Sequence, residues 1–530
     1  MARLETFVLT GKYGQTLLFA LAAALVAFSA DVSAPVTDNF HEGELLGFLW
    51  HLRDYYQGTA DFPVLVHGAM DYLPEWFAFR VFGFDRTIVG THVIVMLLTA
   101  LQYLLLLHTC YLLTDSKNHR TLWTLLLLLY FYYVTPQFDA SVIEASYFPL
   151  RDLFLSLTLW CLVNSALAAG SLQARCWLAA GSVSTVVALY WCYNRGLITL
   201  AFVGVFWLGL LARRKIGSAI LMLAVLVATA AILDRLRVFG TLRENASNIL
   251  YWLKYGAEVN RPRFLPEYAP GIAGLAALCL LALAVLALAL AARRKIRFDN
   301  DLLAAFVAGL FVVLALNIKV VFGVPDLEYA LHGGWPAVML LLVYGSRLVT
   351  VDTSAVTRHL ADLRCQWTDS GRPARLALAL AGVALLGFLA IAHHHAFLPF
   401  ARFAKNLVRP VANAQILPHD ILDVSRVVAE SGDDCYFNWV NDDVVAFLAG
   451  KKHCTDFPYA HYAGISHEQR LLAQLQAAAP SLIILEEDFW PFTRYQERMA
   501  DRLPATARYI AENYGQPATI GNYRVVFRNP

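Results

Sequence analysis

Long apolar runs recur along most of the chain, and they constrain its fold more than any other feature. A bilayer core of about 30 Å needs roughly 20 predominantly apolar residues in a helix. Hydrophobic residues make up 58% of the chain and charged residues only 15%, which excludes a soluble globular protein. We therefore predict an α-helical polytopic membrane protein. Eleven membrane-spanning helices are expected near residues 15–34, 88–113, 121–136, 152–170, 176–193, 196–212, 217–234, 271–292, 302–323, 334–350 and 375–392.

Basic residues are concentrated in the connections on one side of the predicted spans. By the positive-inside rule that side is cytoplasmic and includes the N-terminus, and an odd number of spans places the C-terminus outside. Arg3 and Lys12 precede the first apolar run without a convincing cleavage site after it, so we expect a retained helix. The predicted external loop at 235–270 departs from the rule. Either a span is miscounted or its cations are kept outside for a purpose, and the basic clusters one helix away on each side favour the second alternative. The cations are Arg235, Arg237, Arg243, Lys254, Arg261 and Arg263.

The first predicted external loop, residues 35–87, opens with a concentrated acidic motif. Residues 38–44 read Asp-Asn-Phe-His-Glu-Gly-Glu and follow the first span at the mouth of the membrane. A carboxylate there would meet both a lipid-borne substrate and a polar acceptor from water. The alternative is an ordinary helix start, for which Asp38 and Glu42 are suited. Aromatic, apolar stretches at 45–50 and 76–82 predict helices that lie in the membrane interface.

Further polar side chains occur in the other segments predicted to be external. The cytoplasmic connections are short and basic, so we expect the active face to be outside. Lys319 differs from the rest because it lies inside an apolar span, where a cation is costly and usually functional. The loop residues are His67 and Asp71 in the first loop, Glu144, Arg151 and Asp152 near the second, Asn194 and Arg195 between two spans, and Glu328 and His332 in a later loop.

Residues 393–530 have the composition of a soluble domain, which follows a membrane domain at 1–392. Strands predicted at 435–440, 482–485 and 523–527, with a helix at 442–449, indicate a small external α/β domain. Of the eight cysteines, only Cys435 and Cys454 lie in this domain, so a disulfide between them is expected in an oxidising compartment. Two isolated cysteines offer too few ligands for a zinc site. The triplet His393–His395 is also disfavoured as a metal site, because consecutive side chains point in different directions.

This plan resembles the C-type membrane glycosyltransferases, the GT-C superfamily. The shared features are a first helix, a long external loop with an acidic motif and interfacial helices, an acidic second external loop, and an external C-terminal domain. The short elements that carry the resemblance are His41-Glu42-Gly43-Glu44, Arg151-Asp152 and Asn194-Arg195-Gly196. His-Glu-Gly-Glu stands where the best-known members have an Asp-Glu pair. The resemblance implies a polyprenyl-phosphate sugar as donor and a first-loop carboxylate that acts at the acceptor.

Transfer from a lipid phosphate needs a base for the acceptor proton and cations for the departing phosphate. Glu42 is the first candidate for the base, with Asp38 and Glu44 as alternatives. For Arg151 an ion pair with a neighbouring acid, and for Arg195 an interfacial snorkelling role, are the alternatives to phosphate binding. The carboxylates are compatible with Mg²⁺ or Mn²⁺ and equally with no metal. The candidates for substrate or phosphate binding are His41, His67, Asp71, Glu144, Arg151, Asp152, Asn194, Arg195, Lys319, Glu328 and His332.

The function expected from the sequence is therefore that of an integral membrane glycosyltransferase, hexosyl or pentosyl and inverting. Its partners would be the bilayer, a polyprenyl-phosphate sugar, and a glycan, lipid or protein acceptor. A net charge of +2 and the lack of a Gly-rich phosphate loop disfavour nucleic-acid binding and an ATP-driven pump. A transporter or flippase is the competing prediction, because it explains an intramembrane Lys319. A membrane-bound acyltransferase or polymer ligase is the third class.

Overall fold

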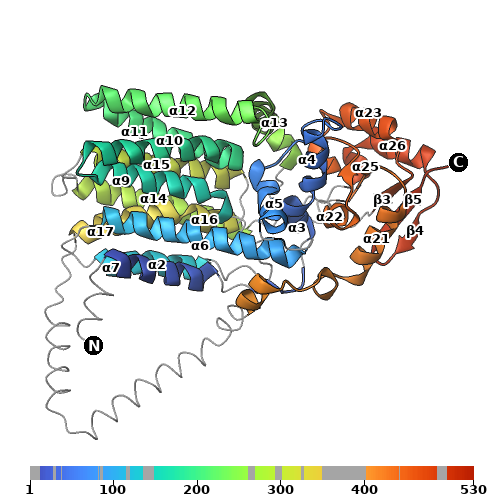
Figure 1. Cartoon of the computed structure of the whole chain (residues 1–530), viewed down its shortest axis with the longest axis horizontal. Helices are drawn as coiled ribbons and strands as arrows, with labels where there is room; N and C mark the ends of the chain where they lie inside the picture. Colours follow the sequence, from blue (N-terminus) through green and yellow to red (C-terminus); the bar gives the residue numbers. More distant parts are fainter. Residues whose placement is uncertain are drawn as a thin grey trace, which may run out of the picture.

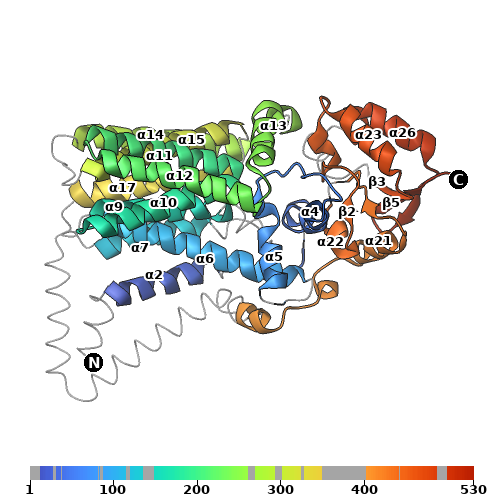
Figure 2. The same cartoon turned by 45° about the horizontal axis from the view of Figure 1, so that its top comes forward.

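The computed structural model describes residues 12–27, 31–36, 39–81, 83, 87–114, 120–134, 149–260, 269–292, 301–323, 327–348, 402–440, 442–485 and 498–530. These residues form an elongated molecule with a bundle of long helices at one end and a small α/β unit at the other (Figure 1). Short helices of the first predicted external loop lie between the two parts. The axes of the bundle helices are roughly aligned with one another, as the rotated view also shows (Figure 2).

Ten of the eleven predicted spans have a helical counterpart in the bundle, and the last one, 375–392, lies outside the described residues. Six of these helices are long and apolar enough to cross a membrane: α6, α10, α11, α12, α14 and α15. The helix bounds are α2 (Lys12–Ala27), α6 (Ile88–Leu113), α7 (Arg120–Val134), α9 (Leu153–Leu167), α10 (Ser171–Trp191), α11 (Tyr193–Ala212), α12 (Ile216–Leu236), α14 (Ala269–Ala292), α15 (Asp301–Gly323) and α17 (Trp335–Leu348). The predicted helical, polytopic fold class is confirmed.

Two predicted spans are longer than the helices that the structure contains. The first was expected to reach residue 34, but by Asp31 the described chain is in a turn, in which the Asp31 carboxylate accepts from the Ser33 backbone N–H at 3.0 Å. The fourth was expected to reach residue 170, but α9 ends at Leu167 because Ala168 is extended. Both helices are therefore shorter than the apolar runs of the sequence, which continue into polar and small residues near the span ends.

A further helix, α13 (Leu242–Asn260), occupies most of the segment predicted to be a cationic loop. One side of it exposes Leu242, Leu250 and Leu253. On the other side, the Asn248 side chain donates to the Pro63 carbonyl oxygen at 3.0 Å, and Trp252 donates from its indole to the first loop. The helix therefore braces the first loop. Arg261 and Arg263 of the same segment lie outside the described residues.

The first loop folds into α3 (Asn39–Leu46), α4 (Phe48–Tyr56), the 3-10 turn η1 (Ala69–Asp71) and α5 (Leu73–Arg80). Helix α5 leaves Trp76 and Phe77 exposed, and both face the apolar space between this loop and the bundle, so its contact with lipid headgroups stays a prediction. Helix α4 differs from the prediction, because Trp50 is buried and its indole N–H donates to the Phe447 carbonyl oxygen at 3.2 Å. The stretch 45–50 therefore packs against the C-terminal unit instead of against lipid headgroups.

The C-terminal unit contains two small sheets, one parallel with order β1-β2 and one antiparallel with order β3-β5-β4. Strands β3 and β5 match the prediction. The predicted strand 435–440 is shortened to β1, and the predicted helix 442–449 starts only at Val444, where the Asp442 carboxylate accepts from its N–H at 3.1 Å. The domain boundary predicted at residue 392 lies outside the described residues. The remaining elements are α16 (Leu327–Gly333), η4 (Asn413–Gln415), α21 (His419–Glu430), β1 (Cys435–Tyr436), α22 (Val444–Ala449), β2 (Lys452–His453), η5 (Ala460–Ala463), α23 (Glu468–Ala478), β3 (Leu482–Leu485), α25 (Met499–Arg502), α26 (Pro504–Asn513), β4 (Ala518–Ile520) and β5 (Tyr523–Phe527).

Two glycines allow the first loop to pack closely against this unit. A Cβ atom added at Gly43 would lie 2.7 Å from the Asp443 backbone nitrogen, and one added at Gly47 would lie 2.5 Å from the Asp443 Cβ. Real Cβ atoms do not approach other atoms that closely, so a larger residue at either position would push α3 away from α22. Gly47 directly follows α3, and its N–H donates to the Gly43 carbonyl oxygen at 2.8 Å, so both glycines face Asp443.

Candidate functional site

Arg195, in the first turn of α11, meets side chains from three other helices in the bundle. Its Nε lies 3.4 Å from the Asp152 carboxylate, and its Nη1 donates to Asn317 Oδ1 at 2.6 Å. Trp335 completes the group by donating from its indole to the second Asp152 oxygen at 2.9 Å. The charged and amide side chains are almost wholly buried. Because a buried ion pair needs such additional hydrogen bonds, this network fixes the positions of four helices.

Arg151 lies next to this network and is held by an aromatic residue. Its Nη1 donates to the Tyr329 hydroxyl at 2.9 Å, and its guanidinium lies 5.4 Å from the centre of the Tyr329 ring. Burial, followed by the charges of Arg195 and Arg151, lowers the pKa of His332 to about 3, so this histidine is neutral. The structure thus brings together Arg151, Asp152, Arg195 and His332, which were predicted from three separate loops; we call them the arginine cluster.

The His67–Asp71 pair lies in the first loop beside the arginine cluster. The two Asp71 oxygens accept from the His67 backbone N–H at 2.9 Å and face His67 Nδ1 at 2.8 Å. Burial raises the pKa of Asp71 to about 7, although these hydrogen bonds and the charge of Arg151 act against the shift. A carboxyl group with a pKa near neutrality can accept or release a proton at working pH.

Glu42 pairs with a histidine that the sequence analysis did not select. His92, near the start of α6, places its Nε2 at 2.7 Å from Glu42 Oε1, while its Nδ1 lies 2.9 Å from the Val32 carbonyl oxygen. A carbonyl oxygen only accepts, so Nδ1 carries a proton. Both side chains are buried. The pair thus places a titratable imidazole in direct contact with the Glu42 carboxyl group.

Glu44 lies two residues further on and faces the C-terminal unit. The Tyr462 hydroxyl donates to its Oε1. The buried Asp443 carboxyl is near the same side chain, and burial together with the charges of Asp442 and Glu44 raises the pKa of Asp443 well above its usual range. Its nearest described basic group is His453 Nε2, at 3.5 Å. Glu42 and Glu44 therefore have different surroundings, one in the bundle and one at the contact with the C-terminal unit.

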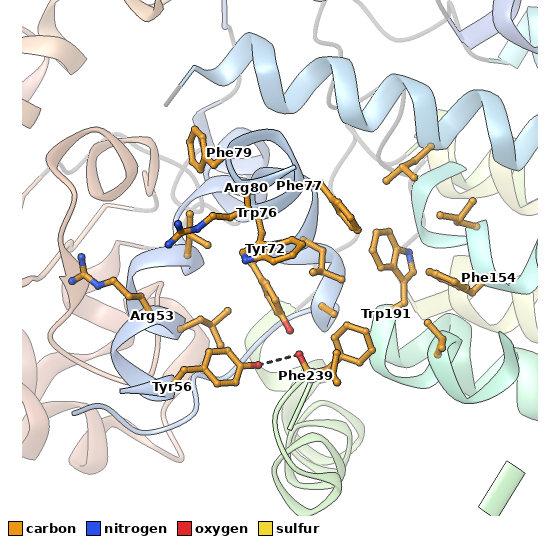
Figure 3. A pocket seen from close by; sticks show the side chains of 18 of the residues that line it. Arg53, Tyr56, Tyr72, Trp76, Phe77, Phe79, Arg80, Phe154, Trp191 and Phe239 are labelled. Carbon is orange, nitrogen blue, oxygen red and sulfur yellow. Dashed lines mark hydrogen bonds between the residues drawn. The ribbon is translucent and has the colours of Figure 1, made fainter. Parts of the chain in front are cut away.

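A large apolar cavity lies between the first loop and the bundle (Figure 3). Its volume is about 900 Å³. Arg53 and Arg80 lie at one side of it, where Figure 3 also shows Tyr56 and Tyr72, while Trp191 and Phe154 line the opposite side. The aliphatic walls come mainly from Leu98, Leu101 and Leu105 of α6 and Leu153 and Leu157 of α9. This apolar cavity therefore combines a hydrocarbon-like interior with a cationic rim.

Several predicted site residues are not brought to these groups. Lys319 is exposed on α15, two residues from the inward-facing Asn317, and Asn194 is exposed although its neighbour Arg195 is buried. Asp38 and Glu144 lie outside the described residues, as do His393–His395. Of His41 and Glu328 only the backbone is described. Within the described part of the chain, no group of three or more His, Cys, Asp or Glu side chains is placed to hold a metal ion.

Sequence reasoning missed three residues that the geometry selects. His92 had a usable signal, because an ionisable side chain near the start of an apolar span is uncommon and usually functional. Arg80 had none, because it stands in the stretch 76–82 that was assigned to the membrane interface, and Arg53 had none, because it follows the stretch 45–50 among aromatic and charged residues. Their position at the apolar cavity depends on how α4 and α5 pack.

The two cysteines that were expected to pair are joined by a disulfide. Cys435 at β1 and Cys454 directly after β2 have an S–S distance of 2.06 Å. The bond lies beside the parallel pairing of Cys435 with Lys452 and of Tyr436 with His453. The remaining cysteines of the described residues are free: Cys110, Cys161, Cys176, Cys192 and Cys279.

Two solved proteins are similar to the chain over most of its length. ArnT from Cupriavidus metallidurans, solved bound to undecaprenyl phosphate and in the apo state, is 13% identical with a TM-score of 0.45, covering 97% of this chain and 98% of that one. The oligosaccharyltransferase of Archaeoglobus fulgidus, solved with Zn and sulfate, is 12% identical with a TM-score of 0.47, covering 95% and 71%. The chain matches no protein-family profile and no curated protein sequence.

Arg195→Ala is expected to cost roughly 3–5 kcal/mol of unfolding free energy, because it leaves the Asp152 carboxylate buried without its cation. Denaturation of the purified protein in detergent measures this. Arg426→Ala is the matched control, since Arg426 forms an exposed pair with Asp423 at 3.3 Å and should contribute at most about 1 kcal/mol. Unchanged stability combined with weakened donor binding would instead place Arg195 at the phosphate.

Proposed function

We propose that this chain transfers a sugar from a polyprenyl-phosphate donor to an acceptor at the outer face of the membrane, with its N-terminus in the cytoplasm and its C-terminal unit outside. The apolar cavity carries this proposal. Its volume of about 900 Å³ is in the range of ligand sites, its walls are aliphatic and aromatic, and Arg53 and Arg80 stand at its rim. An amphiphile with a long hydrocarbon chain and an anionic head matches both properties.

The prenyl chain would lie along α6 and α9. Leu98, Leu101 and Leu105 are spaced by three and four residues, so they form one stripe of α6 that faces the apolar cavity. This stripe follows the helix for roughly 10 Å, at 1.5 Å per residue. Burial of hydrocarbon against it contributes about 25 cal/mol for each Å² removed from water, which favours a long-chain lipid over a soluble sugar phosphate.

The phosphate of the donor would lie at the cationic rim. Arg53 stands above the Trp50 ring at 5.0 Å and bonds Asp54 through its Nε at 2.8 Å, which leaves its terminal amino groups for an anion. Arg80 is exposed at the end of α5 and lines the same space. A guanidinium presents paired donors that fit phosphate oxygens. These two arginines therefore fulfil the role for which Arg151 and Arg195 were predicted.

The arginine cluster lies next to residues that form the wall of the apolar cavity. Leu153 and Trp191 line the apolar cavity, and their sequence neighbours Asp152 and Cys192 face the buried side. Arg151 and Arg195 contribute two positive charges there, beside the carboxylate of Asp152 and the Asp71 carboxyl, whose pKa burial raises to about 7. In a low-dielectric interior such charges act over several ångströms. We assign to the cluster the positioning of the helices and a positive field on the cavity wall.

The chemical step would be a single displacement with Glu42 as base. The acceptor hydroxyl oxygen attacks the anomeric carbon, its proton passes to Glu42, and the C–O bond to the phosphate breaks with the electron pair leaving on the polyprenyl phosphate. One displacement inverts the anomeric carbon. His92 would orient the Glu42 carboxyl group through the contact of its Nε2 with Oε1 at 2.7 Å.

Sugar transfer by the purified protein tests this proposal. A radiolabelled polyprenyl-phosphate sugar is supplied with membrane glycans as acceptors, and label in the glycan fraction is the expected result. A flippase would instead move the labelled lipid between leaflets of a vesicle and leave the sugar attached. Lys319, which first suggested a transport path, is exposed on α15 and does not line the apolar cavity.

A further inference from the structure

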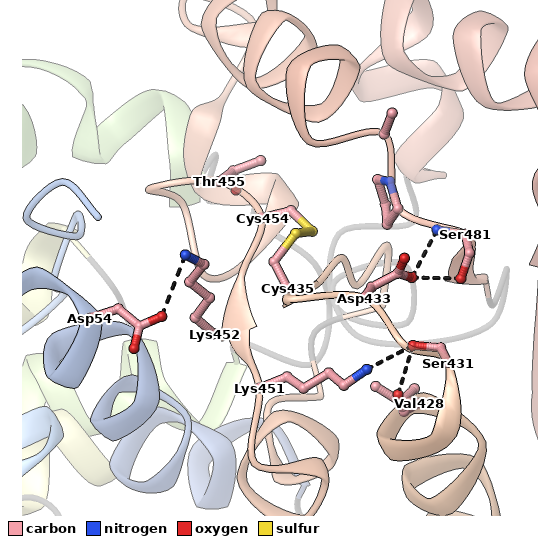
Figure 4. Close-up of a disulfide and its surroundings, with 12 residues drawn as sticks. Asp54, Val428, Ser431, Asp433, Cys435, Lys451, Lys452, Cys454, Thr455 and Ser481 are labelled. Atoms are coloured by element: carbon pink, nitrogen blue, oxygen red, sulfur yellow. Dashed lines mark hydrogen bonds and ion pairs between the residues drawn. A yellow bond between two sulfur atoms is a disulfide. The ribbon is translucent and has the colours of Figure 1, made fainter. Parts of the chain in front are cut away.

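A second, polar cleft lies on the opposite side of α4 from the apolar cavity. Its volume is about 610 Å³, and it separates the end of α4 and the loop after it from the C-terminal unit. Its floor includes the Cys435–Cys454 disulfide, around which Figure 4 shows Lys452, Asp433 and Thr455. The disulfide joins Cys435 to Cys454 across the floor of the cleft. We call this space the polar cleft.

Helix α4 is the wall between the two spaces. Leu49, Leu52, Arg53 and Tyr56 recur at helical spacing and line the apolar cavity, whereas His51 lines the polar cleft. Asp54 also faces that side, where Lys452 Nζ lies 3.4 Å from its Oδ2 (Figure 4). An α-helix with its side chains is about 10–12 Å across. The polar cleft is therefore within one helix diameter of the cationic rim.

The polar cleft has many hydrogen-bond acceptors and few donors. Asp61 and Asp434 are exposed in it, and the buried Asp456 has one carboxylate oxygen with no hydrogen bond among the described residues. Asp433 receives two hydrogen bonds from Ser481 through one oxygen only, at 2.8 and 2.6 Å (Figure 4). Lys452, the cation of the lining, pairs with Asp54, and the Gln474 amide is a further donor there. Arg470, outside the lining, pairs with the other Asp456 oxygen. A ligand that fits must therefore bring donors.

The buried side chain of His51 offers an acceptor nitrogen for such a ligand. Only 3% of it is exposed, and its Nε2 lies 2.9 Å from the Asp61 carbonyl oxygen. Because a carbonyl oxygen accepts, Nε2 carries the ring proton. Burial, followed by the charge of Lys452, lowers the pKa of His51, so the ring stays neutral and Nδ1 is an acceptor. Nδ1 has no hydrogen-bond partner among the described residues.

We propose that the polar cleft binds a sugar unit of the acceptor that presents hydroxyl or amino donors and carries no negative charge. This inference rests on the proposed function only in taking the bound sugar to be part of the acceptor. His51 Nδ1 and the free oxygens of Asp433, Asp434 and Asp456 would accept from the sugar, and the surplus of carboxylates would repel an acidic sugar. The volume lies within the range of small-molecule sites, about 300–1,000 Å³.

Binding of three simple sugars to the full-length protein in lipid nanodiscs tests the inference. Glucosamine, glucose and glucuronate share one ring and differ in charge, and saturation-transfer NMR with titration measures their affinities. Glucosamine should bind most tightly, glucose less tightly, and glucuronate at least about tenfold more weakly than glucose. Equal affinity for all three, or tighter binding of glucuronate, would overturn the inference.

Two substitutions locate the binding. His51→Phe keeps the ring volume and removes the acceptor, and Asp434→Asn removes one exposed charge; each should weaken glucosamine binding by about tenfold. Glu512→Gln removes an exposed carboxylate of the same unit on α26 and should leave binding unchanged. The unfolding temperature of His51→Phe shows whether the fold is kept, and Asp434→Asn decides alone if it is not. Binding that survives both cleft substitutions would reject the assignment.

The outcomes separate this inference from the proposed function. Lipid-dependent sugar transfer with unaltered sugar binding in both variants would remove the polar cleft and keep the transferase. Sugar binding that His51→Phe and Asp434→Asn abolish, without any transfer by the wild-type protein, would keep the cleft as a sugar site and remove the transferase. Tight binding of Mg²⁺ or Ca²⁺ that competes with glucosamine would identify the carboxylates as a cation site and overturn the inference.

Discussion

Glu42→Gln is expected to lower kcat for sugar transfer by about 10²-fold or more, because a side-chain amide cannot take the acceptor proton. The fold should survive. Whether or not His92 Nε2 is protonated, the amide offers a matching group, since its oxygen accepts from Nε2–H and its NH₂ donates to a bare Nε2. Donor KM should change little because the phosphate is bound elsewhere. Initial rates with a labelled lipid donor, at saturating donor concentration, measure the effect.

Two further carboxyl substitutions decide which group is the base. Glu44→Gln keeps the acceptor for the Tyr462 hydroxyl, and Asp71→Asn keeps the acceptor for His67 while it removes the carboxyl whose pKa is raised to about 7. If Glu42 is the base, each should reduce kcat far less than Glu42→Gln does. A larger loss in Asp71→Asn, with full activity in Glu42→Gln, would transfer the role to Asp71.

The helical architecture could be predicted because bilayer thickness and apolar run length determine it together. Helix α6 occupies the predicted range 88–113 without any shift. Helix α13 could not be recognised from an apolar run, because Leu250 and Leu253 alternate with Asn, Lys and Glu and only their spacing marks a helix face. The predicted strand at 435–440 failed for another reason. Its pairing partner β2 is brought alongside by the chain's tertiary fold, so the local pattern could not define its length.

The convergence of the site residues could be predicted only in part. Arg151, Arg195 and His332 each stand at an end of a predicted span on the same side, and sidedness alone brought them near each other. Their burial and pairing depend on helix rotation, which the order of the spans does not determine. For the same reason Asn317 faces Arg195 while Lys319, two residues later, faces outward. The role expected of Lys319 stays a prediction, and its exposed position on α15 does not bring it to Arg195.

The pairing of Glu42 shows what a single acidic motif hides. The motif contains His41 as the neighbouring imidazole. In the structure the partner is instead His92 of α6, 50 residues further along the chain. Such a partner is set by the packing of α3 against α6. Likewise, the apolar cavity exists only because α5 packs against α6 with its aromatic side turned toward α9 and α10. Periodicity predicts helices but not the spaces between them.

Arg53→Gln and Arg80→Gln are expected to raise the donor KM roughly tenfold each and about 10²-fold together, with kcat nearly unchanged. A hydrogen bond to a charged group contributes about 1.5–3 kcal/mol, and glutamine keeps the polar stem of each side chain while it removes the charge. The two residues project from different helices, α4 and α5, so their effects should be close to additive if both contact the phosphate. Michaelis constants measured for one long-chain polyprenyl-phosphate sugar give the result.

Arg426→Gln on the exposed face of α21 is the matched control, because it removes the same charge far from the apolar cavity. The ionic strength of the assay adds a second criterion. If Arg53 and Arg80 hold the phosphate, wild-type KM should rise with added salt, and the double variant should lose most of that dependence. A double variant with wild-type KM and reduced kcat would show that the two arginines act on the leaving phosphate in the transition state only. A double variant with both constants unchanged would place the phosphate at another cation, and Arg151 would then be the next substitution to test.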